Sequence, residues 1–506
     1  MTDAGKSTVR RSIAFAGWAV YAAAMLWLAV TLNIWIDEAY SLRTTSSTLS
    51  HTIASAIGFE QNAPLYFAIL WAWRQASSSV IWARLLSLSC ACASLVVTAG
   101  TVRRCFPRLA AGFVLPVLAL APIFVWSALT IRMYAFSILL VAVFTRLVAV
   151  CVVEERRPTW VETLALALVS IAGTYTTFSF GVLLAGFGCA LAALRRWRAL
   201  GAYAVAMAVA AAACLPLLAA LRHTVSAYAQ AYAFHPSFAS SLVWCASTVA
   251  LSLVGIHELG SLSPTPAHGH GLPGVIAIIV LCAALALTWR RLTPAALVCA
   301  LAVAVSIVIL SVATVVGRVE FFGNHLAFLA VPAGVAITGL LAAAQPSIGS
   351  RGVTVLCALA LAVNAIGFVA RYRVDANSGD WQRVAAYLQA HEHAGEPVLV
   401  FINENELPLQ YYYKGANRLV PIPARASEVV YDLHDVVLHD GSQIDAALER
   451  AGMSGAKTLW LTRVDLCEYA GVTFGCDALD RWLAARYDVL ESVEFYGTSV
   501  LHLSRR

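Results

Sequence analysis

The chain has 506 residues, of which 60% are hydrophobic and only 12% are charged, with a net charge of +6. A soluble globular domain carries about 25% charged residues, so this composition excludes an ordinary soluble protein and indicates a polytopic membrane protein. No basic stripe with interleaved aromatic residues is present, which argues against a nucleic-acid partner.

The first predicted element is a membrane span at residues 12–34. Lys6, Arg10 and Arg11 precede it, and basic residues beside a span favour the cytoplasmic side. The apolar run is long enough to cross a bilayer, and no small-residue cleavage site separates it from the polar residues that follow. We therefore expect a retained first helix with the N-terminus in the cytoplasm.

Two adjacent carboxylates, Asp37 and Glu38, lie just beyond the outer end of this span, within the sequence Trp-Ile-Asp-Glu-Ala-Tyr-Ser at residues 35–41. Carboxylates are costly near hydrocarbon, so a pair at the membrane boundary is a candidate functional site. The alternative is a pair of solvated interface charges that end the helix.

An outer loop at residues 35–79 follows. Its apolar stretch at 64–76 is too short to span and fits a helix lying in the interface. The complete set of predicted spans is 12–34, 80–102, 109–127, 132–152, 160–176, 178–194, 200–220, 273–289, 295–316, 326–344 and 352–370. These eleven spans make residues 1–370 a membrane domain and leave the C-terminus outside.

A second outer loop is predicted at residues 221–271. It contains an apolar stretch at 240–256, which we interpret as interfacial or re-entrant. Counting that stretch as a span would place Arg290 and Arg291 outside, against the preference of basic residues for the cytoplasmic side.

Residues 371–506 have the composition of a soluble α/β domain, which this topology places in the periplasm. Hydrophobic periodicity predicts helices at 380–393 and 477–487, and strands at 398–402, 457–461 and within 489–503. Cys467 and Cys476 lie close together in this domain. The sequence leaves open whether they form a disulfide, as an extracytoplasmic location allows, or remain two free thiols.

The unusual polar residues collect on the predicted outer face. They are Asp37, Glu38, Arg43, Glu60, Asn62, Arg84, Arg132, Tyr134, Arg222, His257, Glu258, Arg318 and His325. The inner face offers short basic turns without a phosphate-binding glycine loop. An enzyme whose chemistry lies outside would need an activated donor delivered in the membrane, such as a lipid-linked one.

Four sequence segments resemble the successive signatures of GT-C glycosyltransferases. They are residues 35–41, Asn-Ala-Pro-Leu-Tyr-Phe at 62–67, Ile-Arg-Met-Tyr-Ala at 131–135, and a tail-domain pattern that includes 380–388, 398–400 and 411–415. The most similar group is the family 39-like set, which includes protein O-mannosyltransferases, lipid A aminoarabinose transferases and bacterial lipopolysaccharide-modifying relatives. The resemblance implies an inner-membrane enzyme that transfers a sugar from a polyprenyl phosphate to a glycan, lipid or protein acceptor at the outer surface.

The resemblance also implies roles for individual residues. Asp37 would be the general base that deprotonates the acceptor hydroxyl, and Glu38 would position the loop or the acceptor, or be an interface charge only. Arg132 would bind the departing phosphate, the alternative being a snorkelling arginine at a helix end. The other residues expected to bind substrate are Arg43, Tyr66, Tyr134, Arg318 and His325. For His325, a capping role at the interface is an equal alternative.

Two weaker groups complete the candidates. Glu60 with His257, or with His268 and His270, could hold a divalent metal, the alternative being a flexible polar loop. In the tail domain, Glu404, Glu406 and the tyrosines at 411–413 could contact the sugar or the acceptor. A solvated loop beside an aromatic core strand is the other interpretation.

Two further functions compete with a transferase. A transporter or flippase for a lipid-linked saccharide would carry ionisable residues at mid-membrane and broken helices in two related halves. Few charges fall deep in the predicted spans, and no internal repeat is visible. The third alternative is a non-catalytic partner subunit. The sequence leaves the sugar, the acceptor and the oligomeric state open.

Overall fold

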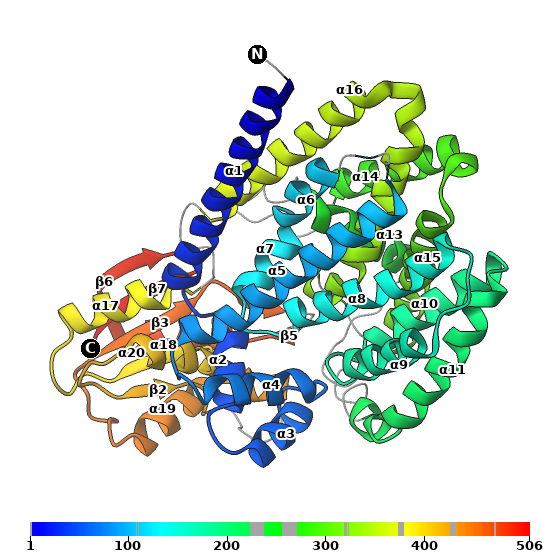
Figure 1. The fold of residues 1–506 in the computed structure, drawn as a ribbon. Helices are drawn as coiled ribbons and strands as arrows, with labels where there is room; N and C mark the ends of the chain where they lie inside the picture. Colours follow the sequence, from blue (N-terminus) through cyan, green and yellow to red (C-terminus); the bar gives the residue numbers. More distant parts are fainter. Residues whose placement is uncertain are drawn as a thin grey trace.

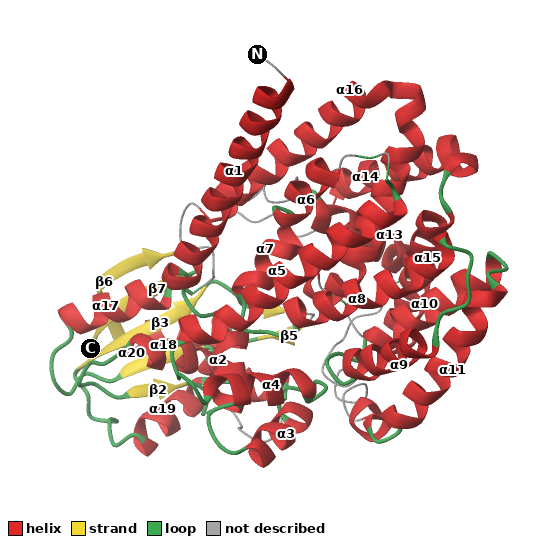
Figure 2. Cartoon of the chain, in the orientation of Figure 1, coloured by secondary structure: helices red, strands yellow, loops and turns green. Residues whose placement is uncertain are grey.

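A computed structural model describes residues 3–107, 109, 111–222, 237–255, 271–317, 321, 323–372, 379–425, 432–469 and 472–506. It consists of a large helical body with a small α/β domain packed at one end (Figure 1). All the strands lie in that domain (Figure 2). The predicted fold class, a helical polytopic membrane protein with a C-terminal α/β domain, is confirmed.

The helical body is built from the following elements. They are α1 (Asp3–Thr31), α2 (Ile36–Thr44), α3 (Leu49–Gly58), α4 (Leu65–Arg74), α5 (Val80–Cys105), α6 (Ala111–Ala119), α7 (Pro122–Leu129), α8 (Tyr134–Val153), α9 (Trp160–Thr174), α10 (Phe180–Ala193), α11 (Trp197–Cys214), α13 (Phe238–Leu253), α14 (Gly271–Thr288), η2 (Trp289–Arg291), α15 (Pro294–Gly317), η3 (Gly323–Leu329) and α16 (Ala330–Tyr372).

Within the described residues, six helices are long and apolar enough to cross a membrane, or seven if the bent pair α1 and α2 is one span. Helices α9, α10 and α13 are apolar but shorter. Three predicted spans differ in form from the structure. Residues 109–127 are divided between α6 and α7, where Pro122 begins the second helix, and the last two spans form one long α16 bent at Gly349, whose φ is 70°. The total of eleven spans remains a prediction.

The tail domain follows α16. Its elements are α17 (Trp381–His391), β1 (Val398–Phe401), η4 (Asn403–Asn405), α18 (Glu406–Tyr412), β2 (Leu419–Pro421), η5 (Leu433–Val436), α19 (Gly441–Arg450), β3 (Thr458–Val464), β4 (Glu468–Tyr469), β5 (Val472–Thr473), α20 (Cys476–Arg486), β6 (Tyr487–Phe495) and β7 (Thr498–Arg505). Every helix and strand predicted in this region is present. Strands β2, β4 and β5 and helices α18 and α19 were not predicted.

The main sheet of the tail domain has the strand order β2-β1-β3-β7-β6. Strands β2, β1 and β3 are parallel, and β7 and β6 complete the sheet as an antiparallel hairpin. All four residues of β1 are buried, as expected for a central strand covered on both faces. The carboxyl ends of β1 and β3 therefore lie side by side at one edge of the sheet.

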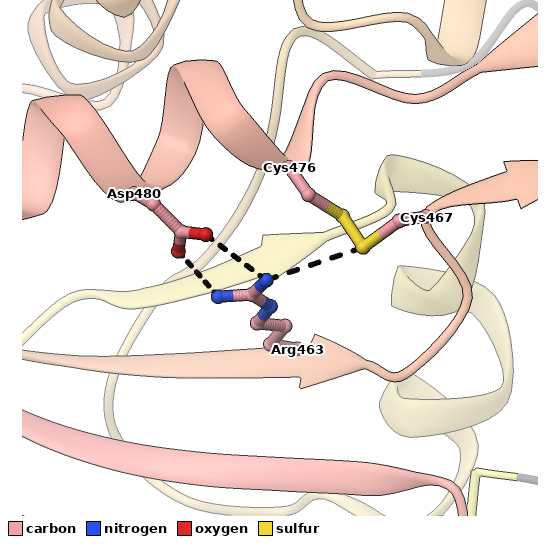
Figure 3. Close-up of a disulfide and its surroundings, with 4 residues drawn as sticks. All are labelled: Arg463, Cys467, Cys476 and Asp480. Atoms are coloured by element: carbon pink, nitrogen blue, oxygen red, sulfur yellow. Dashed lines mark hydrogen bonds and ion pairs between the residues drawn. A yellow bond between two sulfur atoms is a disulfide. The ribbon is translucent and has the colours of Figure 1, made fainter.

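A disulfide joins Cys467 and Cys476 (Figure 3), which decides between the two alternatives that the sequence left open. It closes the short segment that carries β4 and β5. Beside it, Arg463 donates hydrogen bonds to both carboxylate oxygens of Asp480 at the start of α20. The end of β3, the β4–β5 segment and α20 are thus held together.

The tail domain packs on the bend between α1 and α2. The backbone N–H of Ile34 donates to the Tyr412 hydroxyl at 2.9 Å. The Asn33 side chain accepts from the backbone N–H of Gln382 at 2.8 Å and donates to Asp380. These contacts fix the tail domain beside the residues that follow the first predicted span.

Candidate active site

The site begins with the bend between α1 and α2, whose axes differ by 77°. Arg84, fully buried in α5, donates hydrogen bonds to the backbone carbonyls of Ala29, Leu32 and Asn33. Carbonyls at a helix C-terminus lack partners within the helix, so Arg84 satisfies the end of α1. The same guanidinium forms a bidentate pair with Glu38, at 3.2 and 3.1 Å.

Glu38 takes part in the contacts that hold this bend. It is 0% exposed and, besides Arg84, accepts hydrogen bonds from the backbone N–H groups of Trp35 and Ile131. It does not line the cavity described below. Its burial contradicts a solvated interface charge. Glu38 holds the backbone of the residue before Arg132, and its predicted roles, catalytic or positioning, remain predictions.

Asp37, by contrast, faces a cavity of about 690 Å³ between the helical body and the tail domain. Its carboxylate is 28% exposed. The cavity brings together five of the residues predicted to form the site, namely Asp37, Glu60, Arg132, Tyr134 and His325. The residues that meet here come from α2, the α3–α4 loop, the α7–α8 turn, the start of α8 and η3.

Arg132 is the central cation of the cavity. Its Nη1 donates to Glu60 Oε2 at 2.5 Å and to Ser41 Oγ at 3.1 Å, and its Nε lies 3.8 Å from Asp37 Oδ2. The side chain is buried at 7% exposure, so it is not a snorkelling arginine in water. Within the described structure all its hydrogen bonds come from Nη1, which leaves other guanidinium donors for a ligand.

Glu60 is the counter-ion of Arg132. One of its carboxylate oxygens accepts from Arg132 and the other from Thr44 Oγ1 at 3.1 Å. Burial raises the pKa of Glu60, while the attraction of Arg132 opposes that increase. The described residues contain no group of three or more His, Cys, Asp or Glu side chains that could hold a metal ion. His257, His268 and His270 lie outside those residues, so the metal site remains a prediction.

Tyr134 and His325 line the same cavity and are connected through Asn324. The Asn324 amide donates to the Tyr134 hydroxyl at 2.9 Å, and its oxygen accepts from the backbone N–H of His325. Asn324 was not among the predicted site residues, although its position directly before His325 could have drawn attention to it. It also lines a second, mainly apolar cavity.

This apolar cavity, of about 270 Å³, lies between α7, α13 and α16. Its walls include Trp126, Leu251 and Phe368, with Arg371 among them. Since Asn324 lines both cavities, the apolar one adjoins the polar one. A ligand with a charged head and an apolar chain fits such an arrangement.

Two predicted substrate contacts lie elsewhere. Arg43 stacks on Phe59 at 4.5 Å and lines a separate cavity of about 510 Å³ on the tail-domain side of α2. Tyr66 is packed in the core beside Phe67 at 1% exposure and lines none of these three cavities. Arg318 lies outside the described residues.

The tail domain contributes more to the site than the sequence indicated. Glu404 and Glu406 are buried, at 9% and 5% exposure, so the solvated-loop interpretation is wrong for them. Glu404 lines the large cavity together with Ile402 and Asn405. The sequence signal was a cluster of acids directly after a buried strand, which is where ligands approach parallel sheets.

No family model and no curated protein matches the chain. Among solved structures, ArnT from Cupriavidus metallidurans in the apo state matches with a TM-score of 0.56 and 12% identity, covering 97% of this chain and 98% of ArnT. The same protein bound to undecaprenyl phosphate gives a TM-score of 0.48 at 14% identity, covering 96% and 98%. The archaeal oligosaccharyltransferase AglB from Archaeoglobus fulgidus, in complex with an inhibitory peptide and a dolichol-phosphate, gives 0.41 at 10% identity, covering 88% and 69%. ArnT belongs to the GT-C superfamily, so the predicted likeness to GT-C enzymes is confirmed for the fold.

Proposed function

We propose that the protein is a membrane glycosyltransferase that moves a sugar from a polyprenyl-phosphate donor to a hydroxyl-bearing acceptor. The observation that carries this proposal is the pairing of Asp37 with Arg132 in one cavity, beside an adjoining apolar cavity. A carboxylate can accept a proton, and a buried guanidinium can stabilise a phosphate. The fold shared with ArnT agrees with this function.

The two cavities suggest how the donor binds. The first isoprene units would occupy the apolar cavity near Trp126 and Phe368. The phosphate would then lie beside Arg132, with Tyr134 and Asn324 as neighbouring hydrogen-bonding groups. In this pose the sugar points into the large cavity toward the tail domain.

The reaction requires one bond to form and one to break. The acceptor oxygen attacks the anomeric carbon from the face opposite the phosphate, and Asp37 takes the hydroxyl proton. The bond between the anomeric carbon and the phosphate oxygen breaks, and its electron pair leaves with the polyprenyl phosphate. Arg132 stabilises the negative charge on that leaving group. Attack from the opposite face inverts the anomeric configuration.

We also propose the orientation of the chain in a bacterial inner membrane. The basic turns after α5, between α8 and α9 and between α10 and α11 are linked by ion pairs such as Arg104–Glu154 and Arg196–Glu155. Helix α8 runs from Tyr134 at the cavity to the residue before Glu154 in this cluster, and its 20 residues span about 30 Å. Basic turns favour the cytoplasm, and a disulfide in the tail domain fits the periplasm.

The test compares a deletion strain carrying the wild-type protein, Asp37→Asn or no protein. Mass spectrometry of the extracted envelope glycans and lipids should find a sugar-modified component only with the wild-type protein. The Asn variant should accumulate in the membrane to the wild-type level. The same modified component in all three strains would contradict the proposal.

A further inference from the structure

Glu404 stands at the carboxyl end of β1, the strand between β2 and β3 in the parallel part of the sheet. Its backbone is fixed by Asn403, whose side-chain oxygen accepts from the N–H of Glu404 at 2.9 Å. The Asn403 amide in turn donates to the carbonyls of Ala424 and Asp435. Ligands of parallel α/β sheets bind beyond the carboxyl ends of the strands. In this protein that edge of the sheet borders the large cavity.

The side chain of Glu404 reaches the helix that carries the proposed base. It lies beside the Tyr40 side chain of α2, which lines the same cavity. Tyr40 lies three residues after Asp37, so both lie on the same face of α2, and both line the large cavity. Glu404 is thus a buried carboxylate from the tail domain that shares the cavity with Asp37.

The cavity has two chemically different sides. On the body side lie Arg132, Tyr134 and Asn324, next to the apolar cavity proposed for the lipid chain. On the opposite side lie residues of the tail domain, including Glu404 and Ile402. When Arg132 holds the donor, the tail-domain side of the cavity remains open to the second substrate.

We propose that Glu404 is an acceptor-binding residue, which accepts a hydrogen bond from a hydroxyl of the incoming acceptor and holds it next to Asp37. This inference rests on the proposed function and deepens it. The tail domain would be part of the transfer site, and the acceptor would be a polyhydroxy compound with at least one hydroxyl besides the reacting one. An ionised carboxylate accepts such bonds more strongly than a neutral group.

The ionisation of Glu404 gives the proposal a pH signature. Burial raises the pKa of Glu404 to about 7, and the nearby Asp37 carboxylate adds to the increase. The groups that face it are Asp37, Tyr40 and Arg43 of α2 and Asp435 of η5. Glu404 also lines the cavity of about 510 Å³, whose other charged residues include Arg74, Glu406, Lys414 and Arg425. Acceptor binding should therefore strengthen as the pH rises from 6 to 8.

The experiment uses the full-length protein in lipid nanodiscs, with Glu404→Gln and Glu404→Asp as variants. Glu406→Gln is the matched control, because Glu406 is also buried nearby but pairs with Arg425 and does not line the large cavity. Binding of undecaprenyl phosphate is measured by native mass spectrometry. Transfer is measured at pH 6, 7 and 8 on envelope extract from the deletion strain, which supplies donor and acceptor.

Glu404→Gln should bind undecaprenyl phosphate within twofold of wild type, but form at least tenfold less product at pH 8 and lose the increase between pH 6 and 8. Glu404→Asp should retain that increase, and Glu406→Gln should behave as wild type. Wild-type product formation by Glu404→Gln would overturn the inference, as would a parallel loss of undecaprenyl phosphate binding. If Asp37→Asn also forms product normally, the proposed function fails as well.

Discussion

The two walls of the large cavity are built differently. On the body wall, both acidic residues lie beside one cation, because Glu60 binds Arg132 and Asp37 lies 3.8 Å from it. Behind this wall, Glu38 binds Arg84. On the tail wall, Glu404 is buried beside Tyr40, and burial raises its pKa to about 7. The first wall is a compensated ionic network, whereas the second holds a carboxylate near its titration point.

This difference separates positioning from substrate binding. A buried ion pair fixes geometry but loses much stability when one partner is removed. When burial destabilises the charged form of a carboxylate, the folded state loses stability. Carboxylates with a pKa shifted in this way are typical of functional sites. The comparison therefore predicts opposite stability effects for substitutions on the two walls.

The largest effect is expected from Glu38→Ala. This change leaves Arg84 buried without its carboxylate, and breaking such a pair costs about 3–5 kcal/mol. Thermal unfolding of the purified protein should show the loss. Glu154→Ala is the control, because the pairs of Glu154 with Arg104 and Arg156 lie at the surface and should contribute little to stability. Equal midpoints for the two variants would show that the two kinds of pair do not differ.

Arg132→Lys should come next, acting on the reaction rather than on the fold. Lysine keeps the charge but loses the planar fork that holds Glu60 and the proposed phosphate. Removing a preorganised donor of this kind lowers the rate about 10²–10³-fold. Product formation in membranes measures the loss, with Arg104→Lys as the control on the proposed cytoplasmic side. Unchanged activity in Arg132→Lys would show that the fork is not needed.

Glu404→Gln should stabilise the protein at high pH. Since the folded state raises the pKa of Glu404 from 4.5 to about 7, it favours the protonated form. Stability from this group is therefore present below pH 4.5 and is lost as the pH rises through 7. The variant should gain up to about 3 kcal/mol over wild type at pH 8 and nothing at pH 4.5. Thermal midpoints at the two pH values measure this, and a gain independent of pH would contradict it.

Removing the disulfide should have the smallest effect. The bond closes a loop with a sequence separation of 9 residues, for which chain entropy gives roughly 2–3 kcal/mol. The double variant Cys467→Ser with Cys476→Ser should lower the unfolding midpoint of the tail domain. Reductant should lower the wild-type midpoint to the same value. A midpoint insensitive to reductant would refute this.

The sequence predicted much of the fold because hydrophobic periodicity is local. The main helices and strands of the tail domain were found. Asp37, Arg132 and Glu60, which the sequence analysis placed on one face with ten other polar residues, line one cavity. Strand β2 was missed because three residues carry too little pattern. The break between α6 and α7 was missed because the run is apolar throughout, so hydropathy could not show where the helix stops.

The roles within the site were harder to predict because they depend on partners distant in sequence. Asp37 and Glu38 are neighbours, yet only the packing of α5 shows that Glu38 belongs to Arg84, 46 residues later. Arg43 was grouped with the site because the predicted topology puts it on the outer face, and Tyr66 because it belongs to the motif at residues 62–67. Neither side chain lines the large cavity. Glu404 joins the site through tertiary packing across 367 residues, which no local pattern contains.

The most direct test separates binding from turnover in the two central residues. Undecaprenyl phosphate binding and product formation are measured on purified wild type, Asp37→Asn and Arg132→Gln. The account predicts that Asp37→Asn binds the lipid as wild type does while its turnover falls about 10²–10⁴-fold, and that Arg132→Gln loses lipid binding. Full turnover by Asp37→Asn, or unchanged binding by Arg132→Gln, would contradict it.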